Sequence, residues 1–240
     1  WVQETYFLFD WAIMSEPAIR NFRRGSNCMS LRYRHVMSSY KRAVAGGWWL
    51  SGGISVANCI AAYQPKGAAS YAASKTNLAN PGTHDATEGT APDWDAVNGW
   101  KFNGTDDYLK TVVTSENYTM IARYSNYDTA NYYVWLIGWY NTVDSIRNYI
   151  YIAFNRDRAY GWGDLFANTG NTSQSSGVMA LAGQKAYFNS VEDYDFTAQT
   201  WNAGTEYVAY IGARNADGSP DFTNIGPIYC QAAAIYDIAI

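Results

Sequence analysis

The chain has 240 residues, of which 16% are charged and 17% aromatic, and its formal net charge is −4. Residues 1–47 carry seven Lys/Arg and three Asp/Glu, a net charge of +4, and the remainder carries ten against eighteen, a net charge of −8. Nucleic-acid binding requires clustered Lys and Arg, so we expect no nucleic-acid partner. No run of 18 apolar residues occurs, so we expect no membrane span.

The first 47 residues differ from the rest. They are basic and lack a sustained helical period, and we expect an N-terminal extension that is weakly helical or disordered. Gly46-Gly47 and Gly52-Gly53 bracket a Trp-Trp-Leu segment and mark a junction. We therefore predict an extension over 1–47 and one domain over 48–240. Because the sequence begins at Trp1 rather than Met, we expect a fragment or a processed chain.

From residue 57 onward the pattern is that of many short strands. Residues 58–63 form an apolar run, and 64–92 read as a long, partly ordered loop with a helical turn near 68–74. Further strands are expected at 99–103, 108–113, 118–124, 132–140, 148–155, 159–162, 177–182, 185–188, 206–213 and 228–237. Strands without intervening helices favour an all-β sandwich or barrel.

Asn103-Gly104 lies between two of these strands. Both residues tolerate positive φ, and Asn-Gly between strand formers predicts a β-hairpin. The excess of Tyr (21) and Trp (10) also favours sheet, since these rings suit a half-buried pleated surface.

Several segments together resemble the concanavalin A-like, laminin G-like sandwich of phage and prophage structural proteins and bacterial surface proteins. The resemblance runs from about residue 48 to the end and is carried by 58–67, 91–94, 98–104 with 108–109, 118–124, 210–215 and 231–237. It implies an all-β, two-sheet antiparallel jelly roll that recognises glycan or cell-surface material. It also implies other virion or surface proteins as partners and an extracellular or virion-associated location.

The same superfold includes glycoside hydrolases, which need two carboxylates across the scissile bond. The Glu-x-Asp-x-Glu strand of the familiar hydrolases is absent, and the acidic pairs at 93–95, 106–107 and 192–195 read as solvated turns. His35 and His84 lie in no catalytic motif. We therefore expect no catalytic residue and no enzyme.

Asp93, Asp95 and Asn98 could hold a structural Ca²⁺ at a loop rim, with turn capping as the alternative, and we expect no other cofactor. Cys28, Cys59 and Cys230 match no zinc or disulfide framework. Cys59 and Cys230 either pair or remain free, and buried free thiols are favoured.

Sugar binding needs an aromatic wall and a few placed polar groups. A first group of such residues lies at an expected connection between strands: Asn155, Arg156, Asp157, Arg158, Tyr160, Trp162 and Asp164. This site requires that Tyr160 and Trp162 not both be buried. A second candidate group comprises Asn126, Tyr127, Asp128, Trp139 and Tyr140.

The sequence thus predicts a non-catalytic adhesion module that binds a glycan or cell-surface polysaccharide, as part of a phage particle or secreted assembly. A first alternative is a structural module that decorates or oligomerises a fibre or capsid, which would make the chain a homo-oligomer. A second alternative is a glycoside hydrolase of the same superfold.

Overall fold

The computed structural model describes residues 47–127, 133–153, 157–172, 174–202, 204–222 and 226–240. The chain divides into two units, Trp1–Val56 and Ala57–Ile240. The predicted extension, 1–47, lies outside the described residues except for Gly47. In the described part of the first unit, residues Trp48–Gly53 form the 3₁₀ segment η2, in which the rings of Trp48 and Trp49 meet edge-on. A second 3₁₀ turn, η3, spans Val56–Asn58.

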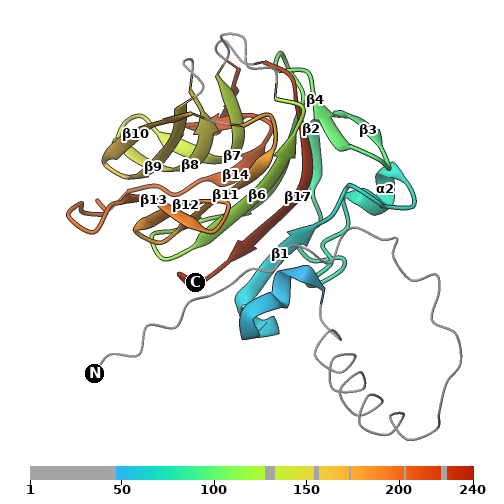
Figure 1. Ribbon diagram of the computed structural model, residues 1–240, viewed down its shortest axis with the longest axis horizontal. Coiled ribbons are helices and arrows are strands. Elements are labelled where there is room, and N and C mark those ends of the chain that lie inside the picture. The colour runs from blue at the N-terminus through green and yellow to red at the C-terminus, as the bar shows by residue number, and fades with distance from the viewer. Residues whose placement is uncertain (1–46, 128–132, 154–156, 173, 203, 223–225) are drawn as a thin grey trace, which may run out of the picture. The chain divides into compact units, whose positions relative to one another are not determined.

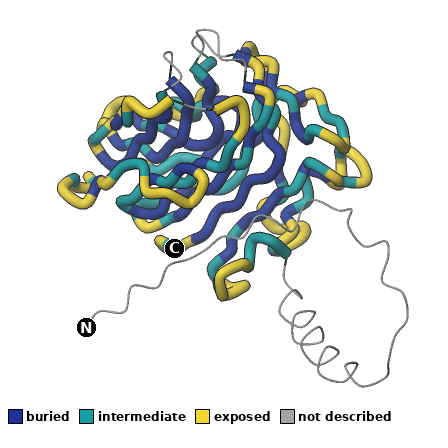
Figure 2. Tube along the Cα trace, in the orientation of Figure 1, coloured by how far each residue is buried: buried dark blue, intermediate teal, exposed yellow. Residues whose placement is uncertain are grey.

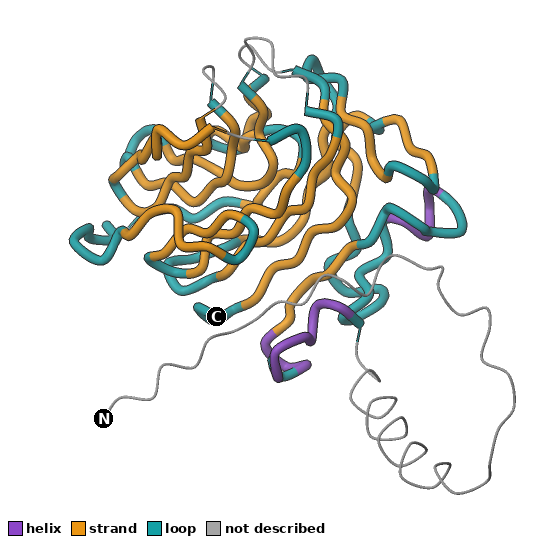
Figure 3. Tube along the Cα trace, in the orientation of Figure 1, coloured by secondary structure: helices purple, strands orange, loops and turns teal. Residues whose placement is uncertain are grey.

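The second unit consists of two sheets, and the predicted all-β two-sheet sandwich is confirmed (Figures 1 and 3). In order, sheet A contains β13 (Val191–Asp195), β12 (Lys185–Phe188), β11 (Gly177–Ala182), β6 (Thr119–Ser125), β17 (Ile228–Tyr236), β4 (Gly99–Phe102) and β3 (Asp93–Asp95). Strand β1 (Cys59–Tyr63) also joins it by pairing with β17.

Sheet B contains, in order, β10 (Leu165–Thr172), β9 (Asp157–Gly163), β8 (Ile146–Ile152), β7 (Val134–Asn141), β14 (Val208–Ile211), β5 (Tyr108–Val113) and β2 (Thr87–Thr90). Strand β15 (Arg214–Ala216) pairs with β16 (Ser219–Asp221) and also with β7. The pairings among described strands are antiparallel except that of β15 with β7, which is parallel. The short helix α2 (Tyr71–Ser74) falls within the predicted helical turn.

Strand β17, which matches the strand predicted at 228–237, lies in the interior of sheet A. It pairs with β6 along one edge, and with β4 and then β1 along the other. Cys59 of β1 lies opposite Tyr236, at the end of β17, whereas Cys230 lies near the start of β17, opposite Trp100. Both are buried free thiols, as favoured from the sequence.

The predicted Asn103-Gly104 hairpin is wrong. Strand β4 belongs to sheet A and β5 to sheet B, so this segment crosses between the sheets. The Oδ1 atom of Asn103 accepts hydrogen bonds from the backbone N–H groups of Thr105 and Asp106, which holds the loop without a strand pair. Gly104 supplies the positive φ of 76°. The local signal for a tight turn was therefore correct, but tertiary packing separates the flanking strands.

The core lies between the inner faces of the sheets (Figure 2). Side chains alternate along each strand, so inward positions such as Met120, Ala122 and Tyr124 of β6 are fully buried. The same alternation places Ile146, Ile150 and Ile152 of β8 in this core, and their neighbours on the opposite face of sheet B.

Candidate functional site

The first predicted sugar site is not a surface connection. Its residues from Asp157 to Trp162 lie in β9, and the rings of Tyr160 and Trp162 are 0% and 1% exposed. Neither ring can stack on a sugar from the core, so the prediction of this site is corrected. Asp157 is half-buried and Asp164 is exposed, whereas Asn155 and Arg156 lie outside the described residues.

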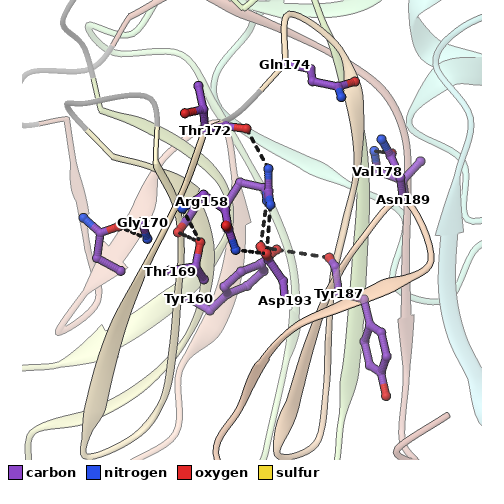
Figure 4. Close-up of polar contacts among 12 residues, drawn as sticks. Arg158, Tyr160, Thr169, Gly170, Thr172, Gln174, Val178, Tyr187, Asn189 and Asp193 are labelled. Carbon is purple, nitrogen blue, oxygen red and sulfur yellow. Dashed lines mark hydrogen bonds and ion pairs between the residues drawn. The ribbon is translucent and has the colours of Figure 1, made fainter.

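Arg158 forms a buried ion pair with Asp193 (Figure 4). Its Nε and Nη2 atoms donate to the two carboxylate oxygens of Asp193 over 2.7 and 2.8 Å, and its Nη1 donates to the carbonyl of Thr172 over 2.7 Å. The hydroxyl of Tyr160 and the amide of Asn171 donate to the same carboxylate. Residues 192–195, predicted to form a solvated turn, lie in strand β13 instead.

This cluster joins the two sheets, because Arg158 lies in β9 of sheet B and Asp193 in β13 of sheet A. Burial alone would raise the pKa of Asp193, but the hydrogen bonds from Arg158 and Asn171 outweigh it, and the pKa lies below its ordinary value. Burial and the nearby Asp193 raise the pKa of Tyr160, so its phenol stays neutral. The carboxylate is satisfied from within the chain, and we assign the cluster a structural role.

The second predicted group is also divided. Trp139 is fully buried, and its Nε1 donates to the Thr114 hydroxyl over 2.8 Å. Tyr127 is buried in the same core, and Asn126 is exposed with a positive φ of 54°. Asp128 lies outside the described residues. Of this group only Tyr140 faces away from the core and is half-buried, so it alone enters the site described below.

Of the predicted calcium residues, Asp93 and Asp95 lie in strand β3, and Asn98 lies in the turn that follows it. The Oδ1 atom of Asp95 accepts from the backbone N–H groups of Val97 and Asn98 over 2.8 and 2.7 Å. These bonds, with the Asn98 backbone first, lower the pKa of Asp95. Asp93 approaches Lys101 at 3.8 Å. No group of three His, Cys, Asp or Glu side chains gathers for a metal within the described ranges. The observed contacts are those of turn capping, and Ca²⁺ at Asp93, Asp95 and Asn98 stays a prediction.

A layer of rings covers the outer face of sheet B, which we call the outer aromatic face. Trp135, Tyr149 and Tyr151 form its centre, with ring centroids 4.3–5.6 Å apart. Further rings surround this centre: Tyr133, Tyr140, Phe166, Phe222, Tyr108 and Tyr210. Phe166 is 40% exposed and stacks on Tyr151, which brings the layer to the protein surface.

Two glycines make room for this layer. Tyr149 of β8 lies between Gly138 of β7 and Gly161 of β9 in the strand register. A Cβ atom at Gly161 would lie 2.5 Å from Cζ of Tyr149, so only glycine lets the ring lie across β9. Gly138 has a φ of 142°, a conformation that side chains with a Cβ rarely adopt.

The β15–β16 hairpin supplies a guanidinium to the same face. Arg214 pairs with Asp221 of the hairpin, and its Cζ lies 4.6 Å from the ring centroid of Trp135 and 5.0 Å from that of Tyr140. Arg147 of β8 lies over Tyr140 from another strand, at 4.8 Å. These are cation–π distances, and each such contact contributes about 0.5–2 kcal/mol.

Burial raises the pKa of Tyr149 to about 12, even though Arg147 and Arg214 favour its ionised form. Its phenol is therefore neutral at physiological pH. Neutral phenols, guanidinium groups and ring faces together provide what a sugar site uses, an apolar wall with a few polar groups. The sequence carried a signal for this face, since Ile146–Ile152 alternates Ile with Arg147, Tyr149 and Tyr151 except at Asn148.

No protein-family model matches the sequence, and no curated protein matches it. The solved structures do give a match. Trypanosoma rangeli sialidase has a TM-score of 0.58 and 12% identity, covering 88% of this chain and 38% of its own. The same sialidase with the inhibitor DANA has a TM-score of 0.57 at 13% identity, covering 88% and 37%. Its complex with sialic acid has a TM-score of 0.53 at 15% identity, covering 78% and 32%.

These comparisons correct one expectation. The sequence excluded an enzyme because catalytic motifs are missing, and the likeness to an enzyme, the sialidase, overturns that exclusion. At such low identity the likeness shows the fold, a β-sandwich, and the activity belongs to the sialidase. The chain spans a little over a third of the sialidase's length. Among the described residues, no helix is long and apolar enough to cross a membrane.

Proposed function

We propose that this chain is the sandwich domain of a glycoside-acting protein and that it contacts glycan through the outer aromatic face. The observation that carries the proposal is the ring layer on sheet B, which reaches the surface at Phe166 and Tyr140 beside the guanidinium of Arg147. The likeness to a sialidase solved with sialic acid supports the carbohydrate class.

A scattered surface ring needs no special explanation, but exposed and half-buried rings that adjoin a buried ring layer beside cations are typical of a binding surface. The rings stand on strands β7, β8 and β10 of sheet B, in which β9 pairs with both β8 and β10, so they are held by a rigid sheet. A pyranose laid on such a layer would place its C–H face on a ring and its hydroxyls near the guanidinium groups.

Binding to a glycan array, followed by titration with the glycans that bind, tests the proposal. Phe166→Ala and Tyr140→Ala should each weaken binding about tenfold or more, the loss expected when a stacking ring is removed. Tyr187→Ala is the matched control, because Tyr187 is a half-buried ring of β12 in sheet A whose neighbours Ala186 and Phe188 face the core. Equal loss in all three variants, or no glycan bound by the parent chain, would contradict the proposal.

Glycoside hydrolysis by the chain itself is the second candidate, and the sialidase likeness favours it. Release of a fluorescent aglycone from sialosides and neutral glycosides would test it. On or beside the outer aromatic face, Asp164 and Asp221 carry carboxylates. Turnover that disappears in Asp164→Asn or Asp221→Asn would support catalysis there, and turnover unchanged in both would exclude these two residues.

The assembly to which the chain belongs and its location are also proposals. A phage particle, a bacterial surface or a secreted assembly, with an extracellular or virion-associated location, follows only from the sequence resemblance. A fibre or capsid module that forms homo-oligomers remains an alternative, which light scattering of the purified chain would test.

A further inference from the structure

We infer that the outer aromatic face selects carboxylate-bearing sugars, with Arg147 as the residue that binds the carboxylate. This inference rests on the proposed function and specifies its ligand. Residues 48–240 carry a net charge of −8, which by itself would repel an anion.

On the outer aromatic face three cations lie beside the carboxylates of Asp164 and Asp221, so positive charge is in excess there. Lys110, Arg147 and Arg214 contribute these cations from β5, β8 and β15. Among the ion pairs of the described residues, Arg214 has Asp221 as its partner, whereas Arg147 and Lys110 have none. A locally cationic aromatic face on an acidic domain indicates an acidic ligand, because long-range repulsion opposes such a ligand elsewhere on the domain.

Arg147 is held in place for this role. Its guanidinium lies 4.8 Å from the ring centroid of Tyr140 and donates to the hydroxyl of that residue over 3.4 Å. It also donates to the carbonyl of Asp164, at the turn into β10. Opposite Arg147 in the register lies Gly163, which has no side chain to cover it. A guanidinium fixed by a ring and a carbonyl loses little freedom when a carboxylate binds its remaining N–H groups.

Two buried donors give a second, independent observation. Trp135 is 7% exposed, and its Nε1 has no hydrogen-bond partner among the described residues; the Nε of Arg214 has none either. The guanidinium of Arg214 lies over the Trp135 ring, so both N–H groups belong to one part of the face. A buried donor without an acceptor costs about 1–3 kcal/mol. The groups left unsatisfied on this face are donors, and a carboxylate only accepts hydrogen bonds.

The same carboxylate chemistry occurs in uronic acids and in sialic acids, and matched ligands separate the two sources. Trigalacturonic acid and its methyl ester differ in charge and in the ester methyl groups, and sialyllactose and lactose differ by the acidic sugar. Affinity for each ligand is measured by calorimetry at two salt concentrations, with the full chain, with Arg147→Gln and with Arg147→Lys. Arg123→Gln, which removes a half-buried cation of β6 in sheet A, is the control.

We expect the full chain to prefer an acid over its neutral partner and to lose this preference at high salt. Arg147→Gln should weaken binding of the acid about tenfold to a hundredfold and leave the neutral partner unchanged. Arg147→Lys should recover only part of the loss, since lysine cannot bind a carboxylate in a bidentate manner.

Equal affinity for acid and neutral ligand, or an unchanged preference in Arg147→Gln, would overturn this inference and leave the proposed glycan function standing. Binding of none of the four ligands, and of no glycan on the array, would overturn both. A preference for only one acid, lost in Arg147→Gln but kept in Arg123→Gln, would support the inference and identify the source.

Discussion

Replacing Arg158 with methionine tests whether the Arg158–Asp193 pair is structural. The two side chains are 11% and 4% exposed, and two hydrogen bonds of 2.7 and 2.8 Å join them. Arg158→Met leaves the carboxylate buried with only Tyr160 and Asn171 as donors. Removing one partner of a buried ion pair costs about 3–5 kcal/mol. The midpoint of thermal unfolding should fall by roughly 6–20 °C for a chain of this size.

Lys185→Met is the matched control. Lys185 pairs with Glu192 and Asp195 on the neighbouring strand, but these side chains are at least 40% exposed. Its loss should cost much less than that of Arg158, because solvent screens exposed pairs. In urea titrations, Arg158→Met combined with Asp193→Leu should recover part of the stability lost in Arg158→Met. Glycan binding should be unaffected in every variant that folds. An Arg158→Met cost no larger than that of Lys185→Met would refute the structural assignment.

The same pair predicts a pH dependence. The pKa of Asp193 is lower in the folded chain than its unfolded value of about 3.9. The stability from its ionised form is therefore complete above that value and is lost as pH falls through the folded pKa. In unfolding titrations between about pH 5 and pH 2, Asp193→Asn should lose less stability than the parent chain. A parallel loss in both proteins would contradict this assignment.

Three further predictions test the core, the outer face and the thiols. Trp162→Ala should lower the free energy of unfolding in urea by about 3–5 kcal/mol, because the ring is fully buried. A loss of glycan binding without destabilisation would contradict this. Gly161→Ala should cost about 1–3 kcal/mol of stability by displacing the ring of Tyr149. Combined with Tyr149→Ala, the same substitution should lose most of that extra cost. A Gly161→Ala variant as stable as the parent chain would show that the ring is not constrained there. Burial raises the pKa of Cys59 and Cys230 to about 12. In a Cys28→Ser background neither thiol should therefore react with a thiol reagent at pH 8 until the chain unfolds, and rapid labelling of the folded chain would refute this. The stability of the fold should also fall as pH rises above about 8.5, where the thiols of the unfolded chain ionise.

Short-range patterns were sufficient to predict the fold class and most strands. Alternation along 119–125 and the apolar run of 228–236 produce β6 and β17 because side chains of a strand point to opposite faces. Strand β13 was predicted to be a turn because acidic residues are common in turns. Its Asp193 is instead paired with Arg158 of the other sheet, a contact that the local sequence does not reveal.

The site depended on tertiary structure. The sequence places Tyr160 and Tyr149 on strands and does not distinguish which of the two rings is exposed. In the fold, sheet A covers Tyr160, whereas the glycines of neighbouring strands accommodate Tyr149 on the outer face of sheet B. Asn103-Gly104 likewise determined a tight loop, while the pairing partners of β4 and β5 determined that the loop crosses between sheets. Local sequence determines which side chains share a face of a strand. Which face is covered, and which cations gather there, depends on contacts between residues far apart in the chain, and these only the folded sandwich decides.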